Sequence, residues 1–472
     1  MFEIKQRGSR VGHEVLGGLT TFMAMSYILV VQPAVLSKAG MDPHAVFMAT
    51  CISAAIGSIL MGLLANYPIA LAPGMGENFF FVFTLCGVGA ASGVFKLTWQ
   101  EALALTAIAG LVFLLLSLVG FRSRLLNAIP DALKSGIAAG IGLFIALIGF
   151  QWGNLLRSNP ATFLELAPLK GNYIAGLTLL GLAITVTLAA WRVRGAVLLG
   201  ILATTAFAAV WPSAANTWWG WQLPGPVWPS TPVAMPHGIE HTAGGLLAGL
   251  GTLAQKAVGP HGLEVLGFGF IVLFMAMFDT VGTLVGVAQR ADLIRDGRLP
   301  HAERALAADA AGTVIGAVAG TSTVTCYIES ITGVTAGART GLAAIVSGVC
   351  LLLALFFQPV AAMIGRGMDV TVTVGQTVTT VARYPLIAPA LIFVGALMIR
   401  TMRDIDWDDV TEAVPAFLTM VTMPFAYSIS AGIAVGFISY AVGKIVTGRP
   451  GQCPLIVYIF AALWVLRYVL LP

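Results

Sequence analysis

LAPGMGENFFF, residues 71–81, lies in a long apolar run, yet it contains a proline, two glycines, a carboxylate and a carboxamide between Pro73 and Asn78. Proline removes a backbone donor and disfavours helix at the preceding residue, so a helix is broken here. Irregular backbone at membrane depth is tolerated only where protein or a cavity encloses it. The stretch therefore predicts an interrupted membrane span at a binding site, with Glu77 and Asn78 at the interruption.

The composition of the chain places it in a membrane. Of its 472 residues, 58% are hydrophobic and only 10% are charged, whereas soluble globular chains carry about 25% charged residues. A chain this long and this apolar cannot hide its apolar surface in a soluble core, so we expect a polytopic integral membrane protein in a lipid bilayer. The sequence has no basic tract with interleaved aromatic residues, and no nucleic-acid partner is expected.

Fourteen apolar segments of about 17–25 residues predict an all-α protein with fourteen membrane spans, seven in each half. The first seven lie near residues 14–34, 45–65, 69–88, 101–120, 131–150, 172–190 and 195–212. The second seven lie near residues 264–288, 305–320, 322–337, 341–364, 384–400, 411–427 and 430–446. For the closing stretch PLIVYIFAALWVLRYVLLP, residues 454–472, an extra span, a re-entrant piece and an interfacial helix all stay open.

Basic residues orient these spans, because lysine and arginine collect in cytoplasmic loops. With a cytoplasmic N-terminus, the basic clusters between spans all lie on the inner side, and the tryptophan-rich loop 213–263 lies outside. The clusters are Lys5, Arg7 and Arg10; Arg122 and Arg124; Arg192 and Arg194; Arg290, Arg295, Arg298 and Arg304; Arg400 and Arg403; and Lys444 and Arg449.

The two halves are related by an internal repeat. The tetrapeptide FMAM occurs at 22–25 and again 252 residues later at 274–277, and nearly the same offset carries Asn78 onto Glu329. The second position follows TSTVTCYI, residues 321–328, whose β-branched residues favour extended backbone. An odd number of spans in each half implies inverted halves. We therefore expect two short extended pieces that pair near the middle of the membrane and direct two half-helices at a ligand.

Three acids, Glu77, Asp279 and Glu329, lie within apolar spans. Each unpaired charge there costs about 3 kcal/mol or more, so a functional role is favoured over a structural, hydrogen-bonded acid. Adjacent residues of a helix point about 100° apart. With Asn78 facing the site, Glu77 is expected to face a neighbouring helix or the cytoplasmic path. Asp309 lies near the start of a span, where a cap or gating role is expected.

These side chains suit a flat heterocycle. A desolvated carboxyl group can hold a proton at neutral pH and release it when water enters, and a carboxamide both donates and accepts hydrogen bonds. Fixed negative charge would repel an inorganic anion, which disfavours an anion transporter. A membrane enzyme is disfavoured because none of the six histidines lies inside a core span. We expect no catalytic residues, no metal site and no cofactor, and a proton as the coupling ion.

Three stretches, ANYPIALAPGMGENFFF, FMAMFDTVGTL and GTSTVTCYIESITGVTAGARTGL, resemble the signatures of nucleobase:cation symporters, and most closely those of the AzgA-like branch that carries adenine, guanine and hypoxanthine. The resemblance implies a seven-plus-seven inverted repeat with short antiparallel strands in spans three and ten. It implies a core domain, residues 1–120 and 264–365, and a gate domain, residues 121–212 and 366–472. Import of purine bases by proton symport and alternating access is the implied activity, and transport of another nucleobase such as xanthine or uracil is the alternative.

The resemblance also implies roles for single residues. Asp279 and Glu329 are implied to bind the base, and Asn78 is implied to assist. We further expect Ile328 and Thr283 at the substrate, and Asp279, Glu329 and Glu77 as the residues that could take part in proton coupling. The chain departs from the branch at Glu77, where an apolar residue is more usual. Members of the family are commonly homodimers through the gate domain, and the short loops suit a bacterial inner membrane.

Overall fold

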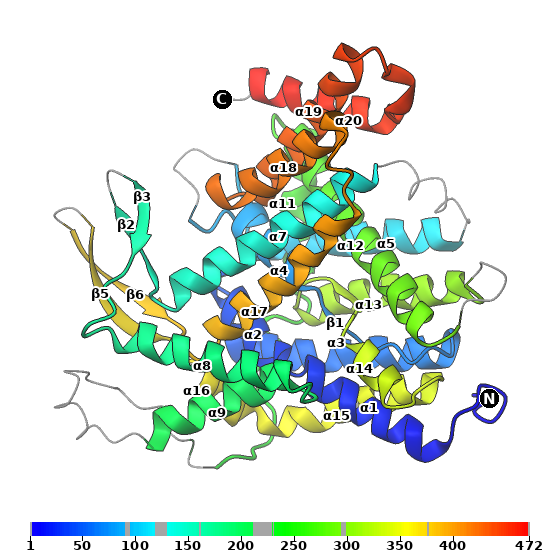
Figure 1. Cartoon of the computed structure of the whole chain (residues 1–472), viewed down its shortest axis with the longest axis vertical. Coiled ribbons are helices and arrows are strands. Elements are labelled where there is room, and N and C mark those ends of the chain that lie inside the picture. Colours follow the sequence, from blue (N-terminus) through cyan, green and yellow to red (C-terminus); the bar gives the residue numbers. More distant parts are fainter. Residues whose placement is uncertain are drawn as a thin grey trace.

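The computed structural model describes residues 2–89, 95–118, 130–159, 162–210, 229, 231–293, 299–374 and 377–470. Within these residues, eight helices are long and apolar enough to cross a membrane, and three shorter apolar helices accompany them. The fold is predominantly helical (Figure 1). The expected polytopic, mainly helical membrane fold is thus confirmed. The basic pairs Arg122/Arg124 and Arg295/Arg298 and the tryptophans between 218 and 228 lie outside the described residues.

The first half of the chain begins with a helix that stops at Met25 and resumes at Ile28. The next helix starts at Pro43, where the Asp42 side chain accepts a hydrogen bond from the Ala45 amide at 2.8 Å and caps the first turn. The elements of this half are α1 (Val11–Met25), α2 (Ile28–Leu36), η1 (Ser37–Ala39), α3 (Pro43–Leu64), β1 (Leu71–Pro73), α4 (Met75–Phe79), the π-helical segment η2 (Phe80–Leu85), α5 (Trp99–Leu118), α7 (Asp131–Trp152), β2 (Leu156–Asn159), β3 (Phe163–Leu166), α8 (Tyr173–Ala190) and α9 (Ala196–Val210).

The second half follows a similar order and adds elements at both ends. Its elements are η4 (Ile239–His241), α11 (Gly245–Val258), α12 (Gly262–Arg290), α13 (Ala302–Ala319), β4 (Val324–Cys326), α14 (Ser330–Thr335), α15 (Gly341–Ala354), η5 (Leu355–Phe357), α16 (Gln358–Gly365), β5 (Met368–Val374), β6 (Thr377–Arg383), α17 (Ala388–Met398), η6 (Ile399–Asp404), α18 (Val410–Phe425), α19 (Ile429–Val446), η7 (Pro450–Gln452) and α20 (Leu455–Leu470).

Strands β1 and β4 pair in the interior, one from each half of the chain. They are antiparallel, in the register Leu71↔Cys326, Ala72↔Thr325 and Pro73↔Val324, and every residue of both strands is buried. The ladder continues beyond β1, because the Tyr327 amide donates to the Ala70 carbonyl at 3.0 Å. The prediction of short antiparallel strands at the two interruptions is confirmed.

Side chains of neighbouring helices satisfy the outer edges of this two-stranded sheet. Ser58 of α3 accepts from the Leu71 amide at 2.8 Å and lies 3.2 Å from the Leu71 carbonyl. On the β4 edge, Thr313 of α13 donates to the Val324 carbonyl at 3.0 Å. No water is available at membrane depth to bond these backbone groups, so a buried sheet edge requires such partners.

The helices pack in two groups. One group surrounds the paired strands and consists of α1, α3, α5, α12, α13, α14 and α15; the other consists of α7, α8, α9, α17, α18 and α19. The groups meet beside the strands, where α4 contacts α7 and η2 contacts α19. Helices approach closely where they carry small residues, as at Gly62 and Gly341, where a side chain on either glycine would clash with the other backbone. In Figure 1, α19 and α20 form one end of the long axis.

Two hairpins and one helix were not predicted from the sequence. Strands β2 and β3 pair as one hairpin, and β5 and β6 as another. Both strands of the second hairpin contain five consecutive valine or threonine residues, and such β-branched residues favour strands. Helix α11 lies within the segment 213–263 that was predicted as a loop, and the closing apolar stretch forms α20, which packs on α19.

Candidate substrate site

The predicted site residues lie where the two paired strands end. Strand β1 leads into α4, which carries Glu77 and Asn78, and β4 leads through Ile328 to Glu329, the N-cap residue of α14. Helix α12 passes alongside and carries Asp279. The sheet therefore brings together residues about 250 positions apart in the sequence, as the repeat offset predicts.

Asp279 is held by the central residue of β4. The Thr325 hydroxyl donates to Asp279 Oδ2 at 3.1 Å, and Thr325 is itself fully buried. Asp279 is exposed although it lies well inside a helix of membrane-crossing length. Its Oδ1 makes no hydrogen bond to the described residues, so this oxygen is available to accept one from a ligand.

Glu329 receives a hydrogen bond from Tyr27, which lies at the bend between α1 and α2. The Tyr27 hydroxyl donates to Glu329 Oε1 at 2.8 Å, and Tyr27 is buried whereas Glu329 is half-buried. Tyr27 was not predicted from the sequence. The repeat contained the signal, because the offset of 252 that relates the two FMAM tetrapeptides also relates Tyr27 to Asp279. The two residues come from opposite halves of the chain, and their hydrogen bonds lead to the same region, at Glu329 and at Thr325.

An accessible stripe on α12 leads from Asp279 toward the C-terminal end of the helix. Asp279, Gly282 and Gln289 are exposed, and a side chain at Gly282 would meet open space. Gly286 on the same stripe faces Ile328, whose side chain is 48% exposed. One turn toward the other end of α12, Met275 is buried. The exposed positions of α12 thus continue from Asp279 toward the end of the helix that carries Arg290.

Asn78 and Glu77 are placed differently from what the sequence predicted. Asn78 is fully buried, and its Oδ1 accepts from Gln32 Nε2 at 3.2 Å and from the Ser322 hydroxyl, so its carboxamide joins α4 to the surrounding scaffold. Glu77, expected to face a neighbouring helix or the cytoplasmic path, lies beside Gly74 and Thr325 on the side of Asp279 of the neighbouring helix α12. Thr283 is buried. The direction of a side chain just after a helix break depends on the local backbone, which spacing alone does not define.

Asp309 is a fourth carboxyl group in the same region. It is fully buried on α13, where its Oδ1 accepts from the Cys326 amide of β4 at 2.8 Å and its Oδ2 lies 2.6 Å from the Thr280 hydroxyl. The expected cap role is wrong, because α13 already begins at Ala302, two turns earlier. Asp309 instead joins α12, α13 and β4.

The site is acidic without a compensating base. Throughout the part of the chain that the structure describes, the ion pairs all lie elsewhere, and none includes Glu77, Asp279, Asp309 or Glu329. A bare inorganic anion would be repelled by this set. A ligand that offers N–H donors, or a proton, would be attracted.

Aromatic side chains of η2 lie toward the first half of α12, away from the accessible stripe, because Phe80 packs edge-on against Phe268 with ring centroids 6.4 Å apart. Phe83 of η2 packs edge-on against Phe144 of α7 and against Tyr427, with ring centroids 5.9 and 5.5 Å apart. Phe144 and Tyr427 are themselves 5.3 Å apart, and the Tyr427 hydroxyl donates to Gln151 Oε1 at 3.2 Å. These contacts join the two helix groups. We refer to Phe83, Phe144 and Tyr427 as the aromatic seal.

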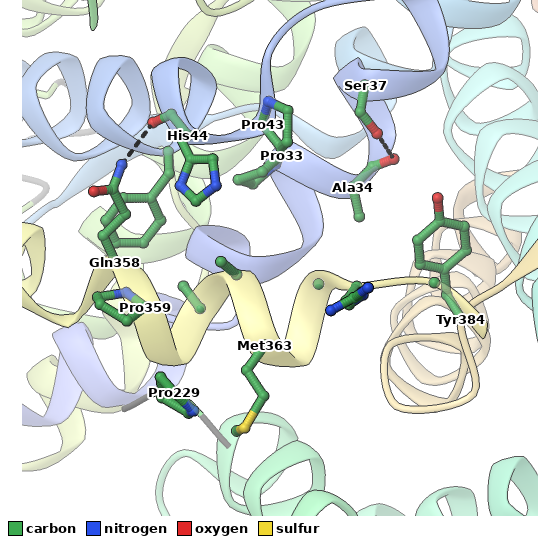
Figure 2. A pocket seen from close by; sticks show the side chains of 16 residues that line it. Pro33, Ala34, Ser37, Pro43, His44, Pro229, Gln358, Pro359, Met363 and Tyr384 are labelled. Carbon is green, nitrogen blue, oxygen red and sulfur yellow. Dashed lines mark hydrogen bonds between the residues drawn. The ribbon is translucent and has the colours of Figure 1, made fainter. Parts of the chain in front are cut away.

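A separate cavity of about 500 Å³ lies away from the four acids, between α2, α3 and α16 (Figure 2). Gln358 lies at its edge and donates to the His44 carbonyl at 3.2 Å, a bond that Figure 2 marks with a dashed line. Prolines form much of the remaining wall, and no acid lines it. Its chemistry is therefore unlike that of the carboxyl site.

Comparison with known proteins identifies relatives over the whole chain. A model of the permease family (Xan_ur_permease) matches residues 12–435. The chain is 40% identical to the guanine/hypoxanthine permease PbuG of Bacillus subtilis, over 100% of this chain and 99% of that protein. It is 38% identical to the adenine permease AdeQ of Escherichia coli, over 100% of this chain and 96% of that protein.

A solved structure shows the same fold at low sequence identity. The transmembrane domain of the cyanobacterium bicarbonate transporter BicA matches with a TM-score of 0.58 and 13% identity, over 92% of this chain and 96% of that chain. The relatives are permeases, which are transport proteins and not enzymes. Since the family model covers most of the chain and both permeases align with it from end to end, this chain belongs to the permease family.

Proposed function

We propose that this permease transports purine nucleobases of the adenine, guanine and hypoxanthine class. The observation that supports the proposal is the pair of carboxyl groups, Asp279 of α12 and Glu329 after β4, which lie beside the paired strands with no basic partner among the described residues. A carboxylate accepts hydrogen bonds only, and purine bases present N–H groups at their edges. The substrates in the names of PbuG and AdeQ agree with this chemistry.

Transport is by proton symport. Asp279, Glu329 and Glu77 have no cationic partner among the described residues, so one proton held by this group of acids lowers the cost of its negative charge at membrane depth. Base and proton then load together and are released together when the site opens to the other side. The coupling ion is a proton, and neither a metal nor a cofactor takes part.

Access alternates between the two sides by movement of the core domain against the gate domain. The core domain is formed by residues 1–120 and 264–365 and the gate domain by residues 121–212 and 366–472, in fourteen spans arranged as a seven-plus-seven inverted repeat. The division of helix packing into two groups supports this assignment. The stripe from Asp279 toward Arg290 and the aromatic seal on the other side correspond to a site open to the cytoplasm.

The protein works in a bacterial inner membrane with its N-terminus in the cytoplasm, as a homodimer through the gate domain. The basic residues near the inner ends of the helices support this orientation, among them Arg7, Arg192 and Lys444. In this orientation the hairpins β2–β3 and β5–β6 and helix α11 lie on the outer face.

The proposal is tested by uptake of radiolabelled hypoxanthine or adenine into proteoliposomes, in competition with purines, xanthine, uracil and inorganic anions. Purines are expected to compete and bicarbonate is not, whereas the anion transporter of the same fold would show the reverse. Asp279→Asn and Glu329→Gln are expected to reduce uptake about tenfold or more, because each removes a charge-assisted hydrogen bond worth about 1.5–3 kcal/mol. Glu303→Gln, on the exposed first turn of α13, is the control. Wild-type uptake and pH dependence in both site variants would contradict the assignment.

A further inference from the structure

Glu77 is a buried acid with one oxygen unpaired. Its side chain is 5% exposed, and Oε1 has no hydrogen-bond partner among the described residues. The other oxygen, Oε2, lies over Gly74, where any side chain would clash with it. The same missing Cβ would lie 3.1 Å from the Thr325 hydroxyl. The absence of a side chain at Gly74 therefore creates the space that Glu77 and Thr325 share.

Thr325 stands between two carboxyl groups that come from different elements. It projects from β4 toward Gly74 and Glu77 of the α4 end, and its hydroxyl donates to Asp279 Oδ2 of α12 at 3.1 Å. A threonine hydroxyl has one hydrogen to donate and can still accept. It can thus accept a hydrogen bond from a protonated Glu77 while it donates to Asp279. The two carboxyl groups differ in access, because Asp279 is exposed and Glu77 is not.

The titratable groups that face Glu77 are all acids or phenols. The carboxyl groups that act on it are Asp279 from α12 and Asp309 from α13. Tyr327, just after β4, is the nearby phenol, and its own neighbours include Glu329.

Helices α7 and α2, which also pack against α4, bring no titratable group to this place. Their nearest contributions are Ile141, which faces Gly76, and Gln32, which bonds Asn78. No lysine, arginine or histidine of the described chain pairs with Glu77.

A buried carboxyl group such as Glu77, with a second carboxyl group beside it and no base to pair with, is costly to ionise, and such pairs share a proton. We propose that Glu77 and Asp279 form a carboxyl pair, bridged by Thr325, in which Glu77 carries the exchangeable proton and Asp279 meets the substrate. The inference rests on the proposed transport function and assigns its coupling proton to a specific side chain. Loss of the proton from Glu77 to water leaves two adjacent negative charges, which weakens the hold on the base and promotes its release.

If Glu77 only capped α4, Glu77→Gln would leave both exchange and accumulation of the base unchanged. Glu77 occupies the third position of α4, from which a side-chain oxygen can reach the free backbone amides of the first turn. Glutamine serves that capping function as well as glutamate does, since both residues are found at this position of capping boxes. Glu77→Gln therefore retains the cap and removes only the titratable proton. Glu77→Asp retains the acid.

The experiment uses the full-length protein in proteoliposomes with a labelled base that the wild type transports. Base exchange at equal pH on both sides measures binding and movement of the site without net proton flow. Accumulation driven by a pH difference measures coupling, and one proton per base supports about tenfold accumulation for each pH unit. Wild type is expected to show both. Glu77→Gln is expected to retain exchange, with an apparent base affinity that no longer changes between pH 5 and 8, and to lose accumulation.

The controls separate this inference from the proposed function. Glu77→Asp is expected to recover accumulation at least in part, and Thr325→Val to weaken it because the bridge is removed. Glu303→Gln should behave as wild type. Accumulation in Glu77→Gln equal to that of the wild type overturns the inference, and so does loss of exchange in a Glu77→Gln protein that elutes as a folded species. If the wild type exchanges no purine, the proposed function itself fails.

Discussion

Asp309 shows how a buried acid is kept in this protein without a cation. The Thr280 hydroxyl lies 2.6 Å from Asp309 Oδ2 and 2.7 Å from the Ala276 carbonyl, yet it has only one hydrogen to donate. Both contacts are satisfied if Asp309 is protonated, because its O–H then donates to Thr280 and Thr280 donates to Ala276. The Cys326 amide bonds the other carboxyl oxygen at 2.8 Å. The protein should therefore tolerate a neutral side chain of the same shape at position 309.

Asp309→Asn is expected to fold with a thermal midpoint close to that of the wild type, because the amide can accept from Cys326 and donate to Thr280. Asp309→Ala leaves the buried Cys326 amide unpaired, which costs about 1–3 kcal/mol. Fluorescence-detected size-exclusion chromatography after heating compares the two variants. Equal destabilisation by both would show that the negative charge of Asp309 is required.

At the scale of elements, the two-stranded sheet depends on partners from outside it. Ser58 bonds the outer edge of β1 at Leu71, and Ser330 accepts from the Ala70 amide at 3.1 Å. Ser53, one and a half turns earlier on α3, is equally buried but donates to the Ala49 carbonyl of its own helix at 2.6 Å. Comparing alanine substitutions at the two serines therefore distinguishes the loss of a hydrogen bond to β1 from the loss of a hydroxyl within α3.

Ser58→Ala is expected to destabilise the protein by about 1–3 kcal/mol, because it leaves a buried backbone amide of β1 unpaired. It should also weaken base binding, since β1 positions the start of α4. Ser53→Ala removes a hydroxyl of the same size from the same helix and should be close to neutral. Thermal midpoints and saturation binding of a labelled purine measure both effects. A Ser53→Ala variant as impaired as Ser58→Ala would refute the role of the strand edge.

The two interruptions and the acids beside them could be predicted from the sequence, because helix-breaking residues and charges are energetically unfavourable at membrane depth. The internal repeat showed which interruption in the first half matches which in the second. The sequence was insufficient for side-chain direction after Pro73, where Glu77 and not Asn78 lies toward Asp279. It also missed Tyr27, which reaches Glu329 from a bend that hydropathy does not reveal. The hairpin β5–β6 was missed because its runs of valine and threonine lie between two long apolar spans.

At the scale of the whole molecule, the aromatic seal joins the two helix groups on one side while the stripe on α12 is open on the other. Phe83 contributes two of the three ring contacts and comes from the π-helical segment η2, whereas Phe144 and Tyr427 belong to the other helix group. Opening of the site to the outside requires these contacts to separate. The strength of the seal therefore sets the balance between the two faces.

Phe83→Ala is expected to increase the outward-facing population about fivefold or more, because two aromatic contacts of about 0.5–1.5 kcal/mol each are lost. The measurement is the reaction of a Gly282→Cys reporter, in a cysteine-free background, with an impermeant maleimide on the cytoplasmic side, which should slow. Phe163→Ala, which removes an exposed ring on the hairpin β2–β3, is the control. Unchanged labelling in Phe83→Ala would contradict the proposed role of the seal.

The pairing of β1 with β4 also constrains how the protein is made. Ribosomes synthesise the chain from its N-terminus, and β4 emerges about 250 residues after β1, which corresponds to roughly 10–50 s at about 5–20 residues per second. During that interval the inner edge of β1 has no partner strand within the bilayer, and only groups already inserted, such as Ser58, can bond it. The first half should therefore stay bound to the translocon or to an insertase until the second half has been synthesised. Chains truncated before residue 326 should be degraded by membrane quality-control proteases.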